Sequence, residues 1–280
     1  MKLLNLNYFD KIYVISVKGS SLLDDLKKEL EILNISKKKI KYYITDRIGN
    51  SNINNDSNFK YKCSVCCGKV CHELTRKYQN IYKHAIKNNF DNIFIFEDDA
   101  RINSGKLPLM EIHNSIKWIS ENPNKWDVFY FGYITESIFS QTGLKHNIVK
   151  LNNIKLSHAH AINIKKCGKK LIDTIDNHNR FWNKNEALIK NKTSNLVYMF
   201  YDTFLYPKHI DCIYSYKLLD KYAYKNSLFY QIVPPSQMKE LGIILDEKNI
   251  NLVNNIGYYF GKYLPICILL YTIYIIINKI

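Results

Sequence analysis

The stretch Asn92–Ala100, NIFIFEDDA, is an apolar run that ends abruptly in three acids. Its segment Ile93–Phe96 is β-branched or aromatic throughout, which predicts a central, buried strand. Alternate side chains of a strand share a face, so Glu97 and Asp99 are expected to point together while Asp98 points away or into the turn.

Two carboxylates at this spacing predict a cation site. Hard oxygen ligands suit Mg²⁺ or Mn²⁺, and such ions bind one or two protein carboxylates and leave their other positions to substrate phosphates. In a basic chain this favours a nucleotide or nucleotide-sugar pocket. The alternative is that the acids simply end a strand in a solvated turn.

Helical and strand patterns alternate on both sides of this run. Strands are expected at Lys11–Val17, Ile40–Thr45, Trp126–Gly132 and Leu156–Ile164, and helices at Leu22–Leu33, Val70–Asn88 and Met110–Glu121. The alternation predicts an α/β fold, with a mixed, mostly parallel sheet covered by helices on both faces. Ligands of such sheets bind at the carboxyl ends of the strands, where the three acids lie.

Composition narrows the functional classes. Hydrophobic residues make up 46% of the 280 residues, which excludes disorder as the main state. Forty Lys and Arg against 25 Asp and Glu give a formal charge of +15, which favours anionic partners. An AT-rich coding bias would produce the same scattered lysines. With no recognition motif and no concentrated basic face, nucleic-acid binding is the weakest hypothesis, and no nucleic-acid partner is expected.

Seven cysteines in a chain of this size indicate a reducing compartment, and no signal peptide is recognised at the start. Four of them lie close together, at Cys63, Cys66, Cys67 and Cys71. Zinc is one interpretation of this cluster. Reduced thiols at the start of a helix are the preferred one, because Cys66 and Cys67 are adjacent and no second half-site follows.

The C-terminal residues 256–280 form a hydrophobic segment in which Lys262 is the only formal charge up to Ile277. As a helix, the run from Ile256 to Ile277 is about 33 Å long, close to the hydrocarbon core of about 30 Å. The sequence therefore predicts three parts: a domain at 1–245, a polar linker at 246–255 and a candidate membrane anchor at 256–280. The domain itself is then expected in the cytoplasm. The alternative is that the segment packs on the domain.

Three segments together carry a resemblance to a known family. NIYKHAIKNNFDNIFIFEDDA (Asn80–Ala100), WDVFYFG (Trp126–Gly132) and SHAHAINIKKCGKKLI (Ser157–Ile172) resemble the family 25 glycosyltransferases. This family includes bacterial lipopolysaccharide galactosyltransferases and collagen galactosyltransferases, and the likeness covers roughly Asp10 to Leu241. The resemblance implies the GT-A-type nucleotide-sugar-binding fold.

The resemblance also implies roles for individual residues. Glu97, Asp98 and Asp99 would hold Mn²⁺, or Mg²⁺, against the diphosphate of a UDP-sugar. Asp46 and His158 match family positions and are candidate donor-binding residues, as are His160, which stands where an aromatic is usual, and Arg101, chosen because it lies just beyond the triplet. Asp211 in PKHIDCIYSY is the candidate catalytic base, and Gln231 and Ser236 match residues that commonly close the domain.

The resemblance implies transfer of a hexose, galactose or glucose, from a UDP-sugar to a hydroxyl of a glycan or protein. It further implies inversion at the anomeric carbon and a role of the kind found in lipopolysaccharide biosynthesis. A carboxylate is then needed to take the proton of the acceptor hydroxyl, and Asp211 suits this role better than the metal-bound Asp98. Each histidine has a structural alternative as a satisfied residue of a buried strand.

The chain departs from the family in two helices. The helix at Leu22–Leu33 lacks the usual early Arg, and the second helix offers Thr75–Arg76 or Lys77–Tyr78 in place of a Ser-His pair. The alternative function is therefore a membrane-tethered, catalytically silent glycosyltransferase-like binding protein.

Overall fold

The computed structural model describes residues 3–46, 69–102, 107–135, 141–143, 147–152, 154–192, 205, 210–215, 219–232 and 252. Its strands are β1 (Lys11–Val17), β2 (Ile40–Thr45), β3 (Asn92–Glu97), β4 (Ala100–Ile102), β5 (Val128–Thr135), β6 (Gln141–Gly143), β7 (Ile148–Leu151), β8 (Ile154–Asn163), β9 (Lys221–Tyr224) and β10 (Phe229–Gln231). Its α-helices are α1 (Ser21–Ile32), α2 (Lys69–Lys87), α3 (Leu109–Glu121), α4 (Lys169–Lys192) and α6 (Ile210–Ser215). Short 3-10 helices lie at Leu6–Tyr8 (η1) and Lys37–Lys39 (η2), and a π-helical turn (η5) at Ile164–Gly168 leads into α4.

An eight-stranded sheet in the order β2-β1-β3-β8-β5-β9-β7-β6 forms the centre of the domain, and β4 pairs with β10 in a separate two-stranded sheet. The five strands and three helices expected from the sequence are all present, with ends that differ by no more than three residues. The strand NIFIFE lies inside the sheet between β1 and β8, and its four central residues are buried.

The sheet is mixed and most of its described strands run the same way, as expected, with β7 and β8 running opposite to the other six. The pairs β1–β2, β1–β3 and β5–β9 are parallel, whereas β3–β8, β5–β8, β7–β9 and β6–β7 are antiparallel. A parallel pair needs a crossover, which is usually helical. Two residues separate β7 from β8, and no helix is described between β5 and β8, so β8 returns antiparallel to β5.

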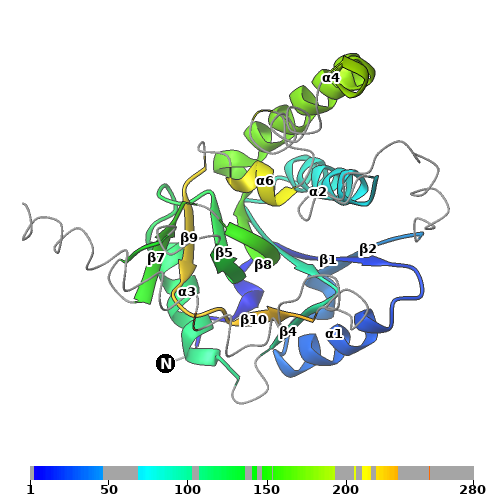
Figure 1. Cartoon of the computed structure of the whole chain (residues 1–280). Helices are drawn as coiled ribbons and strands as arrows, with labels where there is room; N and C mark the ends of the chain where they lie inside the picture. The colour runs from blue at the N-terminus through cyan, green and yellow to red at the C-terminus, as the bar shows by residue number, and fades with distance from the viewer. Residues whose placement is uncertain are drawn as a thin grey trace, which may run out of the picture.

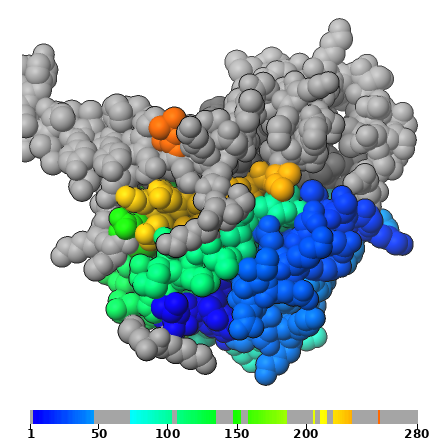
Figure 2. Space-filling view, turned by 90° about the horizontal axis from the view of Figure 1, so that it is seen from below, coloured from blue at the N-terminus to red at the C-terminus, as the bar shows by residue number. Residues whose placement is uncertain are grey.

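Helices cover both faces of the sheet, as the alternating pattern predicts (Figure 1). One face packs against η1, α1 and α3, and Figure 2 shows α1 and α3 on this side with the N-terminal residues between them. The other face packs against α2, α4 and α6. Within β1 the alternation is direct, because Ile12 and Val14 face the first layer while Tyr13 and Ile15 face the second.

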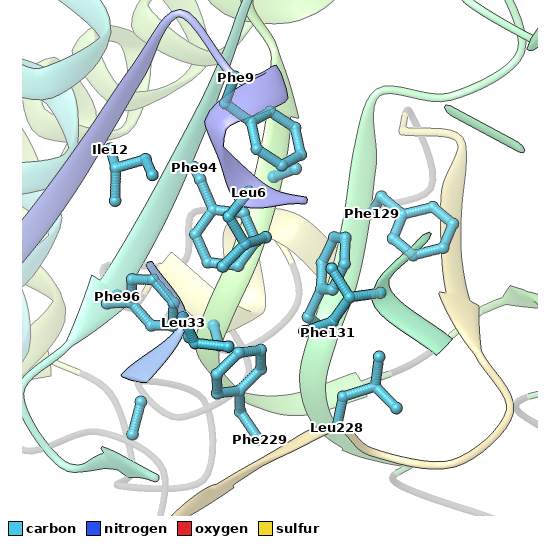
Figure 3. Close-up of a cluster of buried hydrophobic side chains, with 14 of the residues drawn as sticks. Leu6, Phe9, Ile12, Leu33, Phe94, Phe96, Phe129, Phe131, Leu228 and Phe229 are labelled. Atoms are coloured by element: carbon cyan, nitrogen blue, oxygen red, sulfur yellow. The ribbon is translucent and has the colours of Figure 1, made fainter. Parts of the chain in front are cut away.

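Six phenylalanines, Phe9, Phe94, Phe96, Phe129, Phe131 and Phe229, pack together in the core beneath the first face (Figure 3). The ring centroids of Phe94 and Phe96 lie 4.6 Å apart, and the ring of Phe229 packs edge-on against Phe96 at 5.2 Å. Aromatic pairs of this kind each add about 0.5–1.5 kcal/mol beyond the area that they bury. Phe229 therefore ties β10 to the strand that carries the acidic triplet.

Among the helices that the structure describes, none is both long and apolar enough to cross a membrane. The linker at 246–255 and nearly all of the C-terminal segment at 256–280 lie outside the described residues, as do the side chains of the four clustered cysteines.

Candidate functional site

The acidic triplet forms a tight turn between β3 and β4. Glu97 is the last residue of β3, Asp98 and Asp99 make the turn, and Ala100 begins β4. In the register of the sheet Glu97 is opposite Ile15, near the carboxyl end of the parallel strand β1. The turn thus lies at the sheet edge where α/β folds bind their ligands.

Glu97 is oriented from α2, because Tyr78 Oη donates a hydrogen bond to Glu97 Oε1 at 2.8 Å. Burial raises the pKa of Glu97 well above its usual range, and the negative charges of Asp99 and Asp211 raise it further. The hydrogen bond from Tyr78 acts in the opposite direction. The Glu97 carboxyl is therefore a group that a positive charge would stabilise strongly.

Asp98 is held by β1. Ser16 Oγ donates to Asp98 Oδ2 at 2.6 Å, and the carbonyl oxygen of Ser16 accepts a hydrogen bond from Lys77 Nζ at 3.2 Å. Ser16 and Lys77 are both buried. The side chain of Asp98 therefore points toward β1, whereas the side chain of Asp99 points toward β10.

Asp99 is held by β10. Gln231 Nε2 donates to Asp99 Oδ2 at 2.8 Å, and the backbone N–H of Ile232 donates to the carbonyl oxygen of Asp99 at 2.9 Å. The buried atoms Asp99 Oδ1 and Gln231 Oε1 have no hydrogen-bond partner among the described residues. Burial, with the neighbouring charge of Asp98, raises the pKa of Asp99 to about 6 despite the hydrogen bond from Gln231.

The structure brings Asp211 to this turn from 112 positions beyond Asp99, as the first acid of the short helix α6. Asp211 is half-buried and close enough for its charge to raise the pKa values of Glu97, Tyr78 and Tyr130. The predicted base and the predicted metal-binding acids thus share one site.

The carboxylates of the acidic turn suit a divalent cation that has few protein ligands. Glu97 and Asp99 repel each other, and Asp99 offers an unpartnered oxygen. No group of three or more Cys, His, Asp or Glu side chains positioned to hold a metal occurs in the described part of the chain. The residues therefore suit Mg²⁺ or Mn²⁺ bound by one or two carboxylates, with substrate oxygens completing the shell, rather than an all-protein cage.

Arg101 has its guanidinium engaged in holding the turn. Its Nη1 donates to the carbonyl oxygens of Asp98 and Ala100, both at 2.7 Å, and its Nη2 donates to that of Leu22 at 2.9 Å. Glu29, which flanks Arg101 at 4.0 Å, also accepts a hydrogen bond from the N–H of Ile102. The N–H groups of Arg101 thus join the acidic turn to α1. This is a positioning role, which differs from the predicted contact of Arg101 with the UDP-sugar.

His158 is buried between β5 and β10. Its Nε2 donates to the carbonyl oxygen of Phe229 at 2.8 Å. A Cβ at Gly132 would lie only 2.3 Å from this nitrogen, so glycine is what makes room for the ring. This geometry gives His158 a structural role in attaching β10.

His160 belongs to an aromatic network under the acidic turn. Its ring stacks on Tyr78 with centroids 5.7 Å apart, and its Nε2 forms a hydrogen bond with Tyr214 Oη at 3.1 Å. Tyr214 Oη is in turn hydrogen-bonded to Tyr82 Oη. Because Tyr214 lies on α6, three residues after Asp211, the network fixes the helix that carries the candidate base.

Asp46 is exposed directly after β2, at the same sheet edge as Glu97. Two strand spacings, about 10 Å, separate their positions across the sheet. An exposed pair with Lys18, at 3.9 Å, is the described contact of the Asp46 carboxylate. The structure thus places Asp46 on the correct edge but does not join it to the triplet.

Sequence reasoning did not assign site roles to Ser16, Tyr78 or Lys77, although the last two appeared as one possible match to the family's Ser-His pair. The i, i+4 spacing of Tyr78 and Tyr82 on α2 was the available signal, because it puts both rings on one helix face. Ser236 and the side chain of Ser157 lie outside the described residues.

Comparisons with known proteins give only distant likenesses. No family model and no curated protein matches the chain, so the resemblance to family 25 stays a prediction. Among solved structures, A197 from STIV matches with a TM-score of 0.37 and 11% identity over 80% of this chain and 86% of that one.

Two further structures match at a similar level. A glycosyltransferase involved in glycosylation of the major capsid of PBCV-1 has a TM-score of 0.34 and 9% identity over 87% of this chain and 100% of that one. A mannose-1-phosphate geranyltransferase from Thermus thermophilus has a TM-score of 0.39 and 9% identity over 80% of this chain and 75% of that one. Because all three TM-scores are below 0.5, the proposals below rest on the residues of the site.

Proposed function

We propose that this chain is a metal-dependent glycosyltransferase of the GT-A type that transfers a hexose, galactose or glucose, from a UDP-sugar to a hydroxyl of a glycan or protein, with inversion. The observation that carries the proposal is that α6 brings Asp211 toward Glu97 at the carboxyl edge of the sheet, because Tyr214 of α6 packs edge-on at 6.2 Å against Tyr78, the residue that donates to Glu97. A cation site and a separate carboxylate within one site are what such a transfer needs.

Glu97 and Asp99 are the residues that would hold Mn²⁺ or Mg²⁺, with Asp98 beside them. When bound, the ion supplies positive charge that offsets the charge of the leaving diphosphate. Gln231 orients Asp99, and Tyr78 orients Glu97, so both carboxylates are fixed before the donor arrives. Preorganisation of this kind lowers the reorganisation that the transition state requires.

Asp211 is the proposed base. It accepts the proton of the acceptor hydroxyl while that oxygen attacks the anomeric carbon from the side opposite the departing UDP. A carboxylate that binds a cation is a weak base, which leaves this role to the carboxylate outside the triplet. The hydrogen bonds of Tyr214 to His160 and Tyr82 hold α6, and with it Asp211, in place.

Asp46 is proposed to contact the uridine. It follows the strand at the edge of the parallel part of the sheet, two strand spacings or about 10 Å across the sheet from β3 and three residues beyond the position level with Glu97, a separation that a nucleoside diphosphate can span. The diphosphate would then lie across the ends of β1 and β3, over the turn.

The test is a UDP-hexose hydrolysis assay with Mn²⁺, using the full chain. We expect slow release of UDP from UDP-galactose or UDP-glucose, and loss of that release in Asp99→Asn. A matched control is Asp173→Asn, which changes an exposed acid on α4 and should leave the rate unchanged. If the folded wild-type protein releases no UDP from either donor, the enzyme proposal fails and the catalytically silent alternative takes its place.

A further inference from the structure

Lys77 is a buried cation beside the acidic turn that the mechanism above does not use. It lies on α2, its residue is only 8% exposed, and its ammonium is near the carboxyl end of β1. Ser16 connects it to the triplet, because Ser16 accepts from Lys77 through its carbonyl and donates to Asp98 through its hydroxyl.

The ammonium of Lys77 uses few of its donors. Its one hydrogen bond among the described residues goes to Ser16, at 3.2 Å, and it forms no ion pair with them. Burial is the main influence on its pKa and lowers it, against the attraction of Asp98, Glu73 and Glu97. Buried charges in proteins are normally paired, so a buried ammonium with two unused N–H groups is poised for a further anionic partner.

The other cation at the turn, Arg101, already donates its hydrogen bonds within the protein. Arg101 donates to three backbone carbonyls and is flanked by Glu29. Lys77 and Arg101 also differ in position, since Lys77 is beside the end of β1 and Arg101 contacts α1. Of these two cations, Lys77 is the one with hydrogen-bonding capacity left for an anion.

We propose that Lys77 binds a phosphate oxygen of the nucleoside diphosphate, an inference that rests on the proposed function. The Lys77 ammonium then donates its remaining hydrogen bonds to the diphosphate while Ser16 keeps it close to Asp98. If Lys77 served only to offset the negative charge of the nearby acidic side chains, its removal would instead destabilise the fold.

The two roles of Lys77 separate in the variant Lys77→Met. Removing a desolvated charge should leave the melting temperature unchanged or raise it, whereas loss of a structural counter-charge would lower it. Loss of a hydrogen bond to a charged group should weaken UDP binding about 10- to 100-fold. Uridine, which has no phosphate, should bind the variant and the wild type equally.

The experiment is calorimetric titration of UDP and of uridine, with Mn²⁺, into the wild type, Lys77→Met and the control Lys83→Met, which changes an exposed lysine of the same helix. If the wild type binds UDP and Lys77→Met binds it equally well, the inference about Lys77 is overturned and the proposed function stands. If the wild type binds no UDP, the proposed function fails and this inference fails with it.

A second measurement needs no variant, and therefore decides the matter if Lys77→Met does not fold. Acetylation of individual lysines in the wild type is followed by peptide mass spectrometry, with and without UDP, for times long enough that the 8%-exposed Lys77 is measurably acetylated in the ligand-free protein. We expect UDP, but not uridine, to slow the modification of Lys77 while Lys83 reacts at an unchanged rate. Equal modification of Lys77 in both states would overturn the inference.

Discussion

Replacing Gly132 by alanine should loosen the packing of β10 against β5 and β8. The added Cβ would lie 2.3 Å from His158 Nε2, 2.7 Å from His158 Cδ2 and 2.9 Å from the carbonyl oxygen of Phe229. The imidazole cannot stay where it is at such distances, so its hydrogen bond to Phe229 is lost. Because Gln231 lies two residues after Phe229 in β10, its hydrogen bond to Asp99 weakens as well.

The cost of Gly132→Ala follows from two terms. Overpacking of a well-packed core costs about 1–3 kcal/mol, and leaving a buried polar group without its partner costs a further 1–3 kcal/mol or so. Ser227 Oγ also donates to the Phe229 carbonyl at 2.7 Å, so that oxygen stays satisfied and the penalty falls on His158. We expect a loss of about 2–6 kcal/mol in the free energy of unfolding.

Urea denaturation followed by tryptophan fluorescence measures this loss. Gly19→Ala is the matched control, because its Cβ would meet nothing within 4 Å and only the backbone angle φ of +74° resists the change, at about 1 kcal/mol. If Gly132→Ala costs no more than Gly19→Ala, the close packing of His158 against β5 and β10 is refuted.

Three further outcomes are expected. Tyr78→Phe removes the donor to Glu97 and should lower stability by about 1–3 kcal/mol in urea denaturation, and an unchanged stability would contradict that hydrogen bond. Asp211→Asn should slow transfer by about 10²–10⁴-fold while UDP affinity stays within about threefold, and a variant with normal turnover would remove Asp211 as the base. Burial lowers the pKa of Lys221 from 10.5 to about 8, so above pH 8 the unfolded chain binds more protons and stability rises with pH. From about pH 7 to about pH 9.5 the wild type should gain about 2 kcal/mol over Lys221→Met in urea denaturation, whereas a constant difference between them would contradict the shift.

The elements that the sequence predicted correctly are those with a strong local pattern. The buried run of β3 and the long amphipathic helix α2 are set by the spacing of their own apolar residues. Strand direction is different, because it depends on the connections. The antiparallel return of β8 to β5 goes with a connection whose described residues contain no helix, which apolar periodicity does not report.

The candidate site shows the same difference between features set by local sequence and features set by tertiary contacts. The spacing of the triplet placed Glu97 and Asp99 together, and the resemblance placed Asp211 at the same site. The partners of the triplet could not be read from the sequence, because the contact of Asp99 with Gln231 joins residues 132 positions apart. The role of Arg101 depended on where α1 packs, and only the tertiary structure supplies that information.

The acidic turn is proposed to bind a divalent cation together with a nucleoside diphosphate. Calorimetric titration of UDP into the full chain, with and without Mn²⁺, tests it most directly. We expect Mn²⁺ to tighten UDP binding by about tenfold or more, equivalent to about 1.4 kcal/mol, and Asp99→Asn to remove this gain. Equal UDP affinity with and without Mn²⁺, or a gain that survives in Asp99→Asn, would contradict it.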